Sequence, residues 1–186
     1  VPGFALVLGT TRLYGEAGND DMAGQEGDDY ISASAGNDTI LGGQGNDTIV
    51  GGPDNDSIGA LTTDYESGND DISGSSGNDV IAAGSGDDHI DGGSGDDVIY
   101  GDVPGLTFSS GCSDLILGGV GKDDLNGGGT DPEQDLCTNR IEGGNQDDNI
   151  YGGNGADAIY GEAGNDDIYS YGGDDFVEGG DGTDTA

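Results

Sequence analysis

A nine-residue pattern of polar and apolar positions runs through most of the chain and is clearest in residues 42–50, Gly-Gly-Gln-Gly-Asn-Asp-Thr-Ile-Val. When its positions are numbered 1 to 9, glycine occupies positions 1, 2 and 4, aspartate occupies position 6 and an apolar residue occupies position 8. Because position 8 lies between outward positions 7 and 9, it predicts the inward side chain of a three-residue strand. We count seventeen copies, whose apolar residues are Met22, Ile31, Ile40, Ile49, Ile58, Ile72, Ile81, Ile90, Ile99, Ile116, Leu125, Ile141, Ile150, Ile159, Ile168, Val177 and Ala186.

The aspartate at position 6 is equally regular, with Asn139 as the single exception. Glycines at positions 1, 2 and 4 permit positive φ, so a tight turn can direct its carbonyl groups toward an ion. Because calcium takes six to eight oxygen ligands, one turn cannot complete a site, and the ion is expected between stacked turns. The candidate metal ligands are Asp20, Asp29, Asp38, Asp47, Asp56, Asp70, Asp79, Asp88, Asp97, Asp114, Asp123, Asp148, Asp157, Asp166, Asp175 and Asp184.

The pattern resembles G-G-x-G-x-D-x-U-x of the calcium-binding repeats-in-toxin (RTX) family, over residues 15–186. The resemblance implies an all-β fold, a right-handed parallel β-roll (β-solenoid) of about 8–9 turns with two short parallel sheets and calcium in the turns. Two successive copies would form one turn, with positions 1 to 6 as the calcium-binding segment. From the gaps between the aspartates we expect about 10–13 calcium ions.

Interruptions of the pattern suggest how the chain is divided. Residues 1–14 are expected to form an N-terminal cap or a degenerate first turn, and residues 15–186 the β-roll. Insertions lie near 60–67, 102–111 and 129–136, all in even-numbered copies. Since copies two apart lie above one another in a β-roll, we expect all three insertions to leave from the same edge.

The same stacking separates the aspartates into two rows. We call the position-6 residues of odd-numbered copies, beginning with Asp20, the odd row, and those of even-numbered copies, beginning with Asp29, the even row. The odd row is expected to be unbroken, with an ion in most of its gaps. The even row is expected to be damaged by the insertions and by Asn139.

A disulfide is predicted between Cys112 and Cys137, the two cysteines of the chain. Both occupy position 4, in the tenth and twelfth copies, so they should lie in adjacent turns with Cα atoms about 5 Å apart. Such a bond implies an oxidising compartment.

Composition alone would indicate disorder, because the chain has 42 glycines, 31% hydrophobic residues and a formal net charge of −36. The strict phase of the apolar positions argues for a fold instead, and the charge then requires bound cations, since Lys and Arg number only three. The same lack of basic residues excludes nucleic acid and anionic lipid as direct partners. No apolar run approaches the ~20 residues of a membrane span, so no membrane insertion is expected.

The sequence offers few candidate catalytic residues, and we expect no enzymatic activity. His89 is the sole histidine and occupies an outward position 7, which favours solvent exposure over a catalytic or zinc role. An EF-hand is the rival calcium motif, but the glycine content argues against its helices. Tyrosines at position 9, such as Tyr151 and Tyr169, are expected to pack on the outer sheet faces, which we favour over a binding platform.

Together these features predict a non-catalytic, extracellular calcium-binding structural module whose folding is coupled to calcium. One alternative is a building block of an extracellular filament, surface layer or adhesin that self-associates end to end. The other is the calcium-binding C-terminal domain of a secreted enzyme or toxin. The length of the intact precursor would separate these alternatives.

Overall fold

The computed structural model describes residues 9–59, 67–102, 113–128 and 137–186, and every regular element within these ranges is a β-strand. The strands form two sheets, one of nine strands and one of eight. The nine-stranded sheet contains β1 (Arg12–Tyr14), β3 (Tyr30–Ser32), β5 (Thr48–Pro53), β7 (Asp71–Ser76), β9 (His89–Ser94), β11 (Leu115–Val120), β13 (Arg140–Asn145), β15 (Ala158–Ala163) and β17 (Phe176–Glu178). The eight-stranded sheet contains β2 (Asp21–Glu26), β4 (Thr39–Gln44), β6 (Ser57–Ile58), β8 (Val80–Ala82), β10 (Val98–Tyr100), β12 (Asp124–Asn126), β14 (Asn149–Tyr151) and β16 (Asp167–Tyr169).

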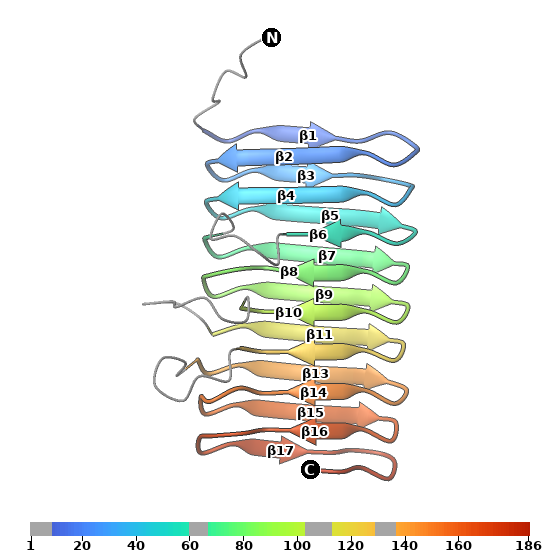
Figure 1. The fold of residues 1–186 in the computed structure, drawn as a ribbon, viewed down its shortest axis with the longest axis vertical. Coiled ribbons are helices and arrows are strands. Elements are labelled where there is room, and N and C mark those ends of the chain that lie inside the picture. The colour runs from blue at the N-terminus through green and yellow to red at the C-terminus, as the bar shows by residue number, and fades with distance from the viewer. Residues whose placement is uncertain (1–8, 60–66, 103–112, 129–136) are drawn as a thin grey trace.

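Successive strands alternate between the two sheets, so each strand pairs in parallel with the strand two places along the chain. The arrows of the odd-numbered strands run one way in Figure 1, and those of the even-numbered strands run the other. The register keeps equivalent positions side by side, as in the pairing of Ile99 with Leu125. Two successive copies therefore make one turn, which confirms the predicted parallel β-roll.

Several strands are longer than the three residues expected from the pattern. β4 (Thr39–Gln44) and seven others span six residues and continue through the glycines of the next copy. Pairing persists there, for example between Gln25 and Gly43, because the turn below repeats the same backbone path. Stacking of identical turns thus extends the sheets beyond the apolar triplet.

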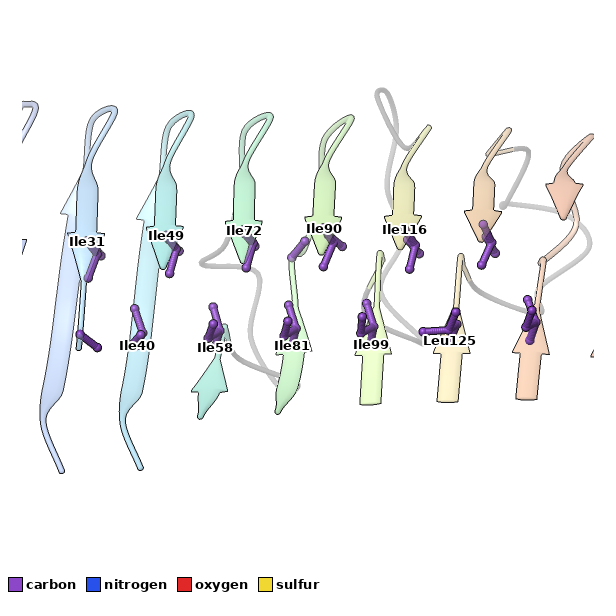
Figure 2. Close-up of a cluster of buried hydrophobic side chains, with 14 of the residues drawn as sticks. Ile31, Ile40, Ile49, Ile58, Ile72, Ile81, Ile90, Ile99, Ile116 and Leu125 are labelled. Atoms are coloured by element: carbon purple, nitrogen blue, oxygen red, sulfur yellow. The ribbon is translucent and has the colours of Figure 1, made fainter. Parts of the chain in front are cut away.

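The core is a narrow double row of the position-8 side chains. Figure 2 shows isoleucines of one sheet pointing toward those of the other, with Leu125 continuing the row. Ile31, Ile99 and Ile150 each have 0% of their surface exposed, whereas Leu13 and Val177, on the outermost strands β1 and β17, are only partly buried. The prediction that position 8 points inward is confirmed.

The described residues that flank the three insertions all lie at one kind of connection. Each insertion follows a strand of the eight-stranded sheet and precedes one of the nine-stranded sheet: β6 to β7, β10 to β11, and β12 to β13. The described residues on either side of each insertion therefore lie at the same edge of the roll. Across the described ranges, no helix has the length and apolar composition to cross a membrane.

Candidate metal centre

Hydrogen bonds link the position-6 side chains into continuous rows. In the odd row, the backbone N–H of each aspartate donates to Oδ1 of the next, one turn along. These bonds measure 2.7 to 3.2 Å and run without a break from Asp20 to Asp184. Because Oδ1 of each aspartate accepts the N–H of the preceding turn, Oδ2 is left for a different partner.

The even row is also continuous as a chain of hydrogen bonds, so neither the insertions nor Asn139 breaks its register, and the expected loss of calcium sites along it stays a prediction. Its hydrogen bonds cross the insertions, from Asp47 to Asp70 at 2.8 Å and from Asp88 to Asp114 at 3.0 Å. They also pass through Asn139, whose Oδ1 accepts from the N–H of Asp114 at 3.0 Å. The insertions lie before position 6 in their copies, which leaves the register of the row intact.

The second carboxylate oxygen, Oδ2, is buried along both rows. The following residues have an Oδ2 that is inaccessible to solvent and lacks a hydrogen-bond donor: Asp29, Asp38, Asp47, Asp56, Asp79, Asp97, Asp123, Asp148 and Asp166. A buried carboxylate oxygen without a donor or cation is costly, so this arrangement calls for a bound positive group.

Beside most of these Oδ2 atoms, a backbone carbonyl oxygen of the adjacent turn faces the same space. A β-carbon added to Gly24, at position 1, would lie 2.3 Å from Oδ2 of Asp29 and 2.5 Å from the carbonyl oxygen of Gly42. A β-carbon on Gly161 would lie 2.4 Å from Oδ2 of Asp166 and 2.4 Å from a carbonyl oxygen of the next turn. At Gly24 and Gly161, two acceptor oxygens from adjacent turns therefore converge where a side chain would otherwise be.

These oxygens have the chemistry of a calcium site rather than of a zinc site. No group of three or more His, Cys, Asp or Glu side chains converges within the described ranges. Carboxylates from adjacent turns, joined by backbone carbonyls, instead provide the hard oxygen ligands that calcium prefers.

The profile of the RTX calcium-binding nonapeptide repeat (4 copies) matches residues 12–31, 24–58, 65–102, 138–168 and 154–186, which is more than half of the chain. The chain belongs to the RTX calcium-binding nonapeptide repeat family. A search of curated proteins found no match. RTX repeats bind calcium at multiple sites, and this RTX chain is accordingly a calcium-binding structural repeat.

Burial makes several of the RTX carboxyl groups weaker acids than usual in the absence of metal. Desolvation raises the pKa of Asp97 and of Asp148 to about 7, while the N–H bond from the preceding turn partly opposes it. Desolvation likewise raises the pKa of Asp47 and of Asp56 to about 6, and neighbouring aspartates add to the rise. Without a cation, these carboxylates are therefore poorly tolerated in their ionised form at neutral pH.

At Asn139, a hydrogen-bond donor takes the place that a carboxylate oxygen has in the other copies of the RTX roll. Its Nδ2 stands where the other copies place Oδ2, and it donates to the carbonyl oxygen of Gly152 at 3.3 Å. Its Oδ1 keeps the row intact toward Asp114. The amide N–H donates directly to this carbonyl oxygen, so no cation is needed here, whereas sites such as that of Asp97 place two acceptor oxygens together.

A second polar row, at position 5, is a feature that the RTX pattern did not predict. There the N–H of the later residue donates to Oδ1 of the earlier one, opposite in direction to position 6, as from Asn37 to Asn19 at 3.2 Å. Lys122 joins this row, and its Nζ lies 2.9 Å from Oδ2 of Asp147. The frequent Asn and Asp at position 5 were the sequence signal that could have revealed it.

The remaining predicted residues lie as follows. Asp20, Asp175 and Asp184, nearest the outer turns, are half-buried, whereas the other position-6 aspartates are buried. His89 is exposed, as predicted, with its Nδ1 3.0 Å from Oδ1 of Asp71. Cys137 is buried, but Cys112 lies outside the described residues, so the disulfide stays a prediction.

Proposed function

We propose that this chain is an extracellular structural module that folds when calcium fills the spaces between its turns, with the position-6 aspartates as ligands. The observation that carries this proposal is the series of buried Oδ2 atoms without donors, most of which face a carbonyl oxygen of the adjacent turn. The module has no catalytic role in this proposal, and when folded it forms a rigid rod.

The energetics of the rows support coupling between metal binding and folding. Charges stacked at the strand spacing of about 4.8 Å repel by about 3 kcal/mol per neighbouring pair at an effective dielectric constant of 20. The core opposes this repulsion with only one apolar side chain per nine-residue copy. Because the unfolded chain has no preformed site, the free energy of binding becomes free energy of folding.

An extracellular location follows from the same coupling. Extracellular calcium modules work at roughly 10⁻⁴ to 10⁻³ M calcium, well above cytosolic levels. A chain with a net charge of −36 would remain unfolded until it reached that concentration. RTX repeat proteins are typically secreted, which agrees with this proposal.

Circular dichroism of the chain during calcium titration tests the proposal. We expect an unfolded spectrum in excess EGTA, a cooperative gain of β-structure near millimolar calcium, and no comparable gain with magnesium, which prefers a smaller octahedral site. Full β-structure in EGTA would contradict the proposal, whatever the location of the protein.

Self-association end to end is a second candidate, favoured by the outermost strands. Val177 on β17 is only partly buried, and Phe176 beside it is 53% exposed. Such an edge offers unpaired backbone groups to any added strand, from a second molecule or from a further segment of the same protein. Sedimentation of the calcium-loaded chain over a range of concentrations distinguishes these cases, since only the first gives growing oligomers. The role of a calcium-binding domain in a secreted enzyme or toxin fits the same geometry.

A further inference from the structure

A column of tyrosines on the outer face of the eight-stranded sheet has one missing member. The position-9 residues of β10, β12, β14 and β16 lie next to one another in register and are Tyr100, Asn126, Tyr151 and Tyr169. Tyr151 and Tyr169 stack with ring centroids 5.2 Å apart and planes 8° apart, which confirms their predicted packing. At β12 the column holds the short side chain of Asn126 instead of a ring.

The missing ring leaves a hollow in the surface. Its walls are Tyr100, Asp124, Asn126, Tyr151 and Tyr171, and its volume is about 260 Å³. Oδ1 of Asn126 accepts a hydrogen bond from the N–H of Gly128 at 3.1 Å, which ties the floor of the hollow to its own turn.

One wall of the hollow comes from an aromatic side chain at a position that most copies fill with a small residue. Tyr171 occupies position 2, a glycine position in the repeat, and has φ of 64°. Its ring centroid lies 6.5 Å from that of Tyr151. Position 2 takes positive φ in other turns too, as at Ser75 and Glu162, so the repeat's own backbone directs the Tyr171 ring toward the hollow.

The spacing of the walls suits a flat group. Tyr100 and Tyr151 are two strands apart, about 9.6 Å at the usual strand spacing, so a planar group between them would lie about 4.8 Å from each ring. The faces of both rings are electronegative, the carboxylate of Asp124 lines the same hollow, and the chain has a net charge of −36. These features together select a cation.

The nine-stranded sheet contains a similar pair of a tyrosine and a carboxylate, and there an arginine of the same chain occupies the space between them. There the guanidinium carbon of Arg140 lies 4.3 Å from the ring centroid of Tyr160. Nε of the same guanidinium donates to Oε1 of Glu142 at 2.8 Å. A guanidinium between a tyrosine face and a carboxylate is therefore an arrangement that this roll forms with its own residues.

We propose that the hollow at Asn126 binds the guanidinium group of an arginine side chain from a partner protein. A guanidinium is planar, remains charged and stacks on aromatic faces, whereas an ammonium group is a compact, strongly hydrated charge. The described arginines of the chain lie elsewhere, Arg12 on β1 and Arg140 on β13, both in the nine-stranded sheet. The bound arginine completes the tyrosine column at the level of β12.

A pair of isosteric probes tests this proposal on the calcium-saturated chain. N-acetyl-arginine amide carries the guanidinium, and N-acetyl-citrulline amide replaces it with an uncharged urea of nearly the same shape. At constant ionic strength, we expect the arginine probe to shift the aromatic NMR signals of Tyr100, Tyr151 and Tyr171 in a saturable manner. The Tyr14 and Tyr30 rings, which pack together on the other sheet, should not respond.

Variants of the hollow separate the site from general charge attraction. Asn126→Tyr should fill the hollow, abolish binding and leave folding intact, because it restores the ring missing from the column. Asp124→Asn should weaken binding at least tenfold, whereas Asp21→Asn, at the equivalent position 7 of β2, should leave it unchanged. Equal binding of the citrulline probe, equal losses in both aspartate variants, or no saturable binding would each overturn the proposal.

Discussion

Nδ2 of Asn139 lies 3.3 Å from the carbonyl oxygen of Gly152 and donates to it, at the place where other copies present a second acceptor oxygen. The roll therefore contains one position-6 site that needs no metal, surrounded by sites that do. Since Oδ1 of Asn139 preserves the hydrogen-bonded row, the difference between the two kinds of site is confined to one atom of one side chain.

Replacing this amide should create a calcium site. In Asn139→Asp, the buried N–H donor becomes an acceptor facing Gly152, and we expect the chain to bind one more calcium ion than the parent. Calcium counting by native mass spectrometry measures this gain directly. In EGTA the variant should be less stable than the parent, and an unchanged ion count would contradict the assignment of this space to calcium.

The reverse change should have opposite effects with and without calcium. In Asp97→Asn, the row keeps its Oδ1 acceptor for the N–H of Asp79, but one buried charge is lost. We expect lower stability in saturating calcium, by roughly 1–3 kcal/mol, because a ligand is missing, and higher stability in EGTA, because repulsion is relieved. Asp96→Asn, exposed at position 5, is the matched control and should change little. Thermal denaturation in saturating calcium measures the first sign, and residual β-structure by circular dichroism in EGTA measures the second; the same sign in both would refute the prediction.

The pH dependence of the calcium-free chain should be inverted relative to that of most proteins. Asp97 and Asp148, with pKa about 7, and Asp47 and Asp56, with pKa about 6, bind protons more tightly when folded than in the unfolded chain, where the value is 3.8. The stability of the calcium-free fold therefore falls as the pH rises through these folded-state pKa values of about 6 to 7. Acidification restores the lost stability.

Circular dichroism of calcium-depleted protein between pH 8 and pH 5 provides the measurement, above the sequence pI of about 4.1. We expect β-structure to increase as the pH falls, by a few kcal/mol of unfolding free energy in total. In calcium-loaded protein the direction should reverse, because protons compete with the metal for the same oxygens. Loss of β-structure on acidification without calcium would contradict the raised pKa values.

Much of this arrangement could be predicted from the sequence, because a strict nine-residue period leaves few alternatives for Ile99 or Asp97. Both occupy fixed positions, and stacking of identical turns converts those positions into rows. The role of Asn139 could not be predicted, since the orientation of its amide depends on carbonyl and N–H groups of two other turns. The hollow at Asn126 was missed for a similar reason, because it is defined by rings from three different turns.

A disulfide between Cys112 and Cys137 remains a prediction, with Cys137 buried at 4% exposure. If the bond forms, non-reducing mass spectrometry of the calcium-loaded chain will find no free thiol. Reduction should lower the unfolding free energy by roughly 3 kcal/mol through the entropy of the released loop. Two alkylatable thiols in the native protein would rule the bond out.

A cavity in the core should appear mainly as a small rise in the calcium concentration at which half of the chains are folded, called here the calcium midpoint. Circular dichroism during calcium titration measures it. Ile99 is fully buried between the sheets, so Ile99→Ala removes contacts that the narrow core cannot replace, at a cost of about 3 kcal/mol. If about ten ions bind together with folding, that cost is shared among them, and the midpoint rises by less than twofold. Val98→Ala, on the outward position 7, is the control and should leave the midpoint within error. A shift of tenfold or more in Ile99→Ala would mean that only one or two ions are coupled to folding, and the cooperative calcium-driven roll would have to be abandoned.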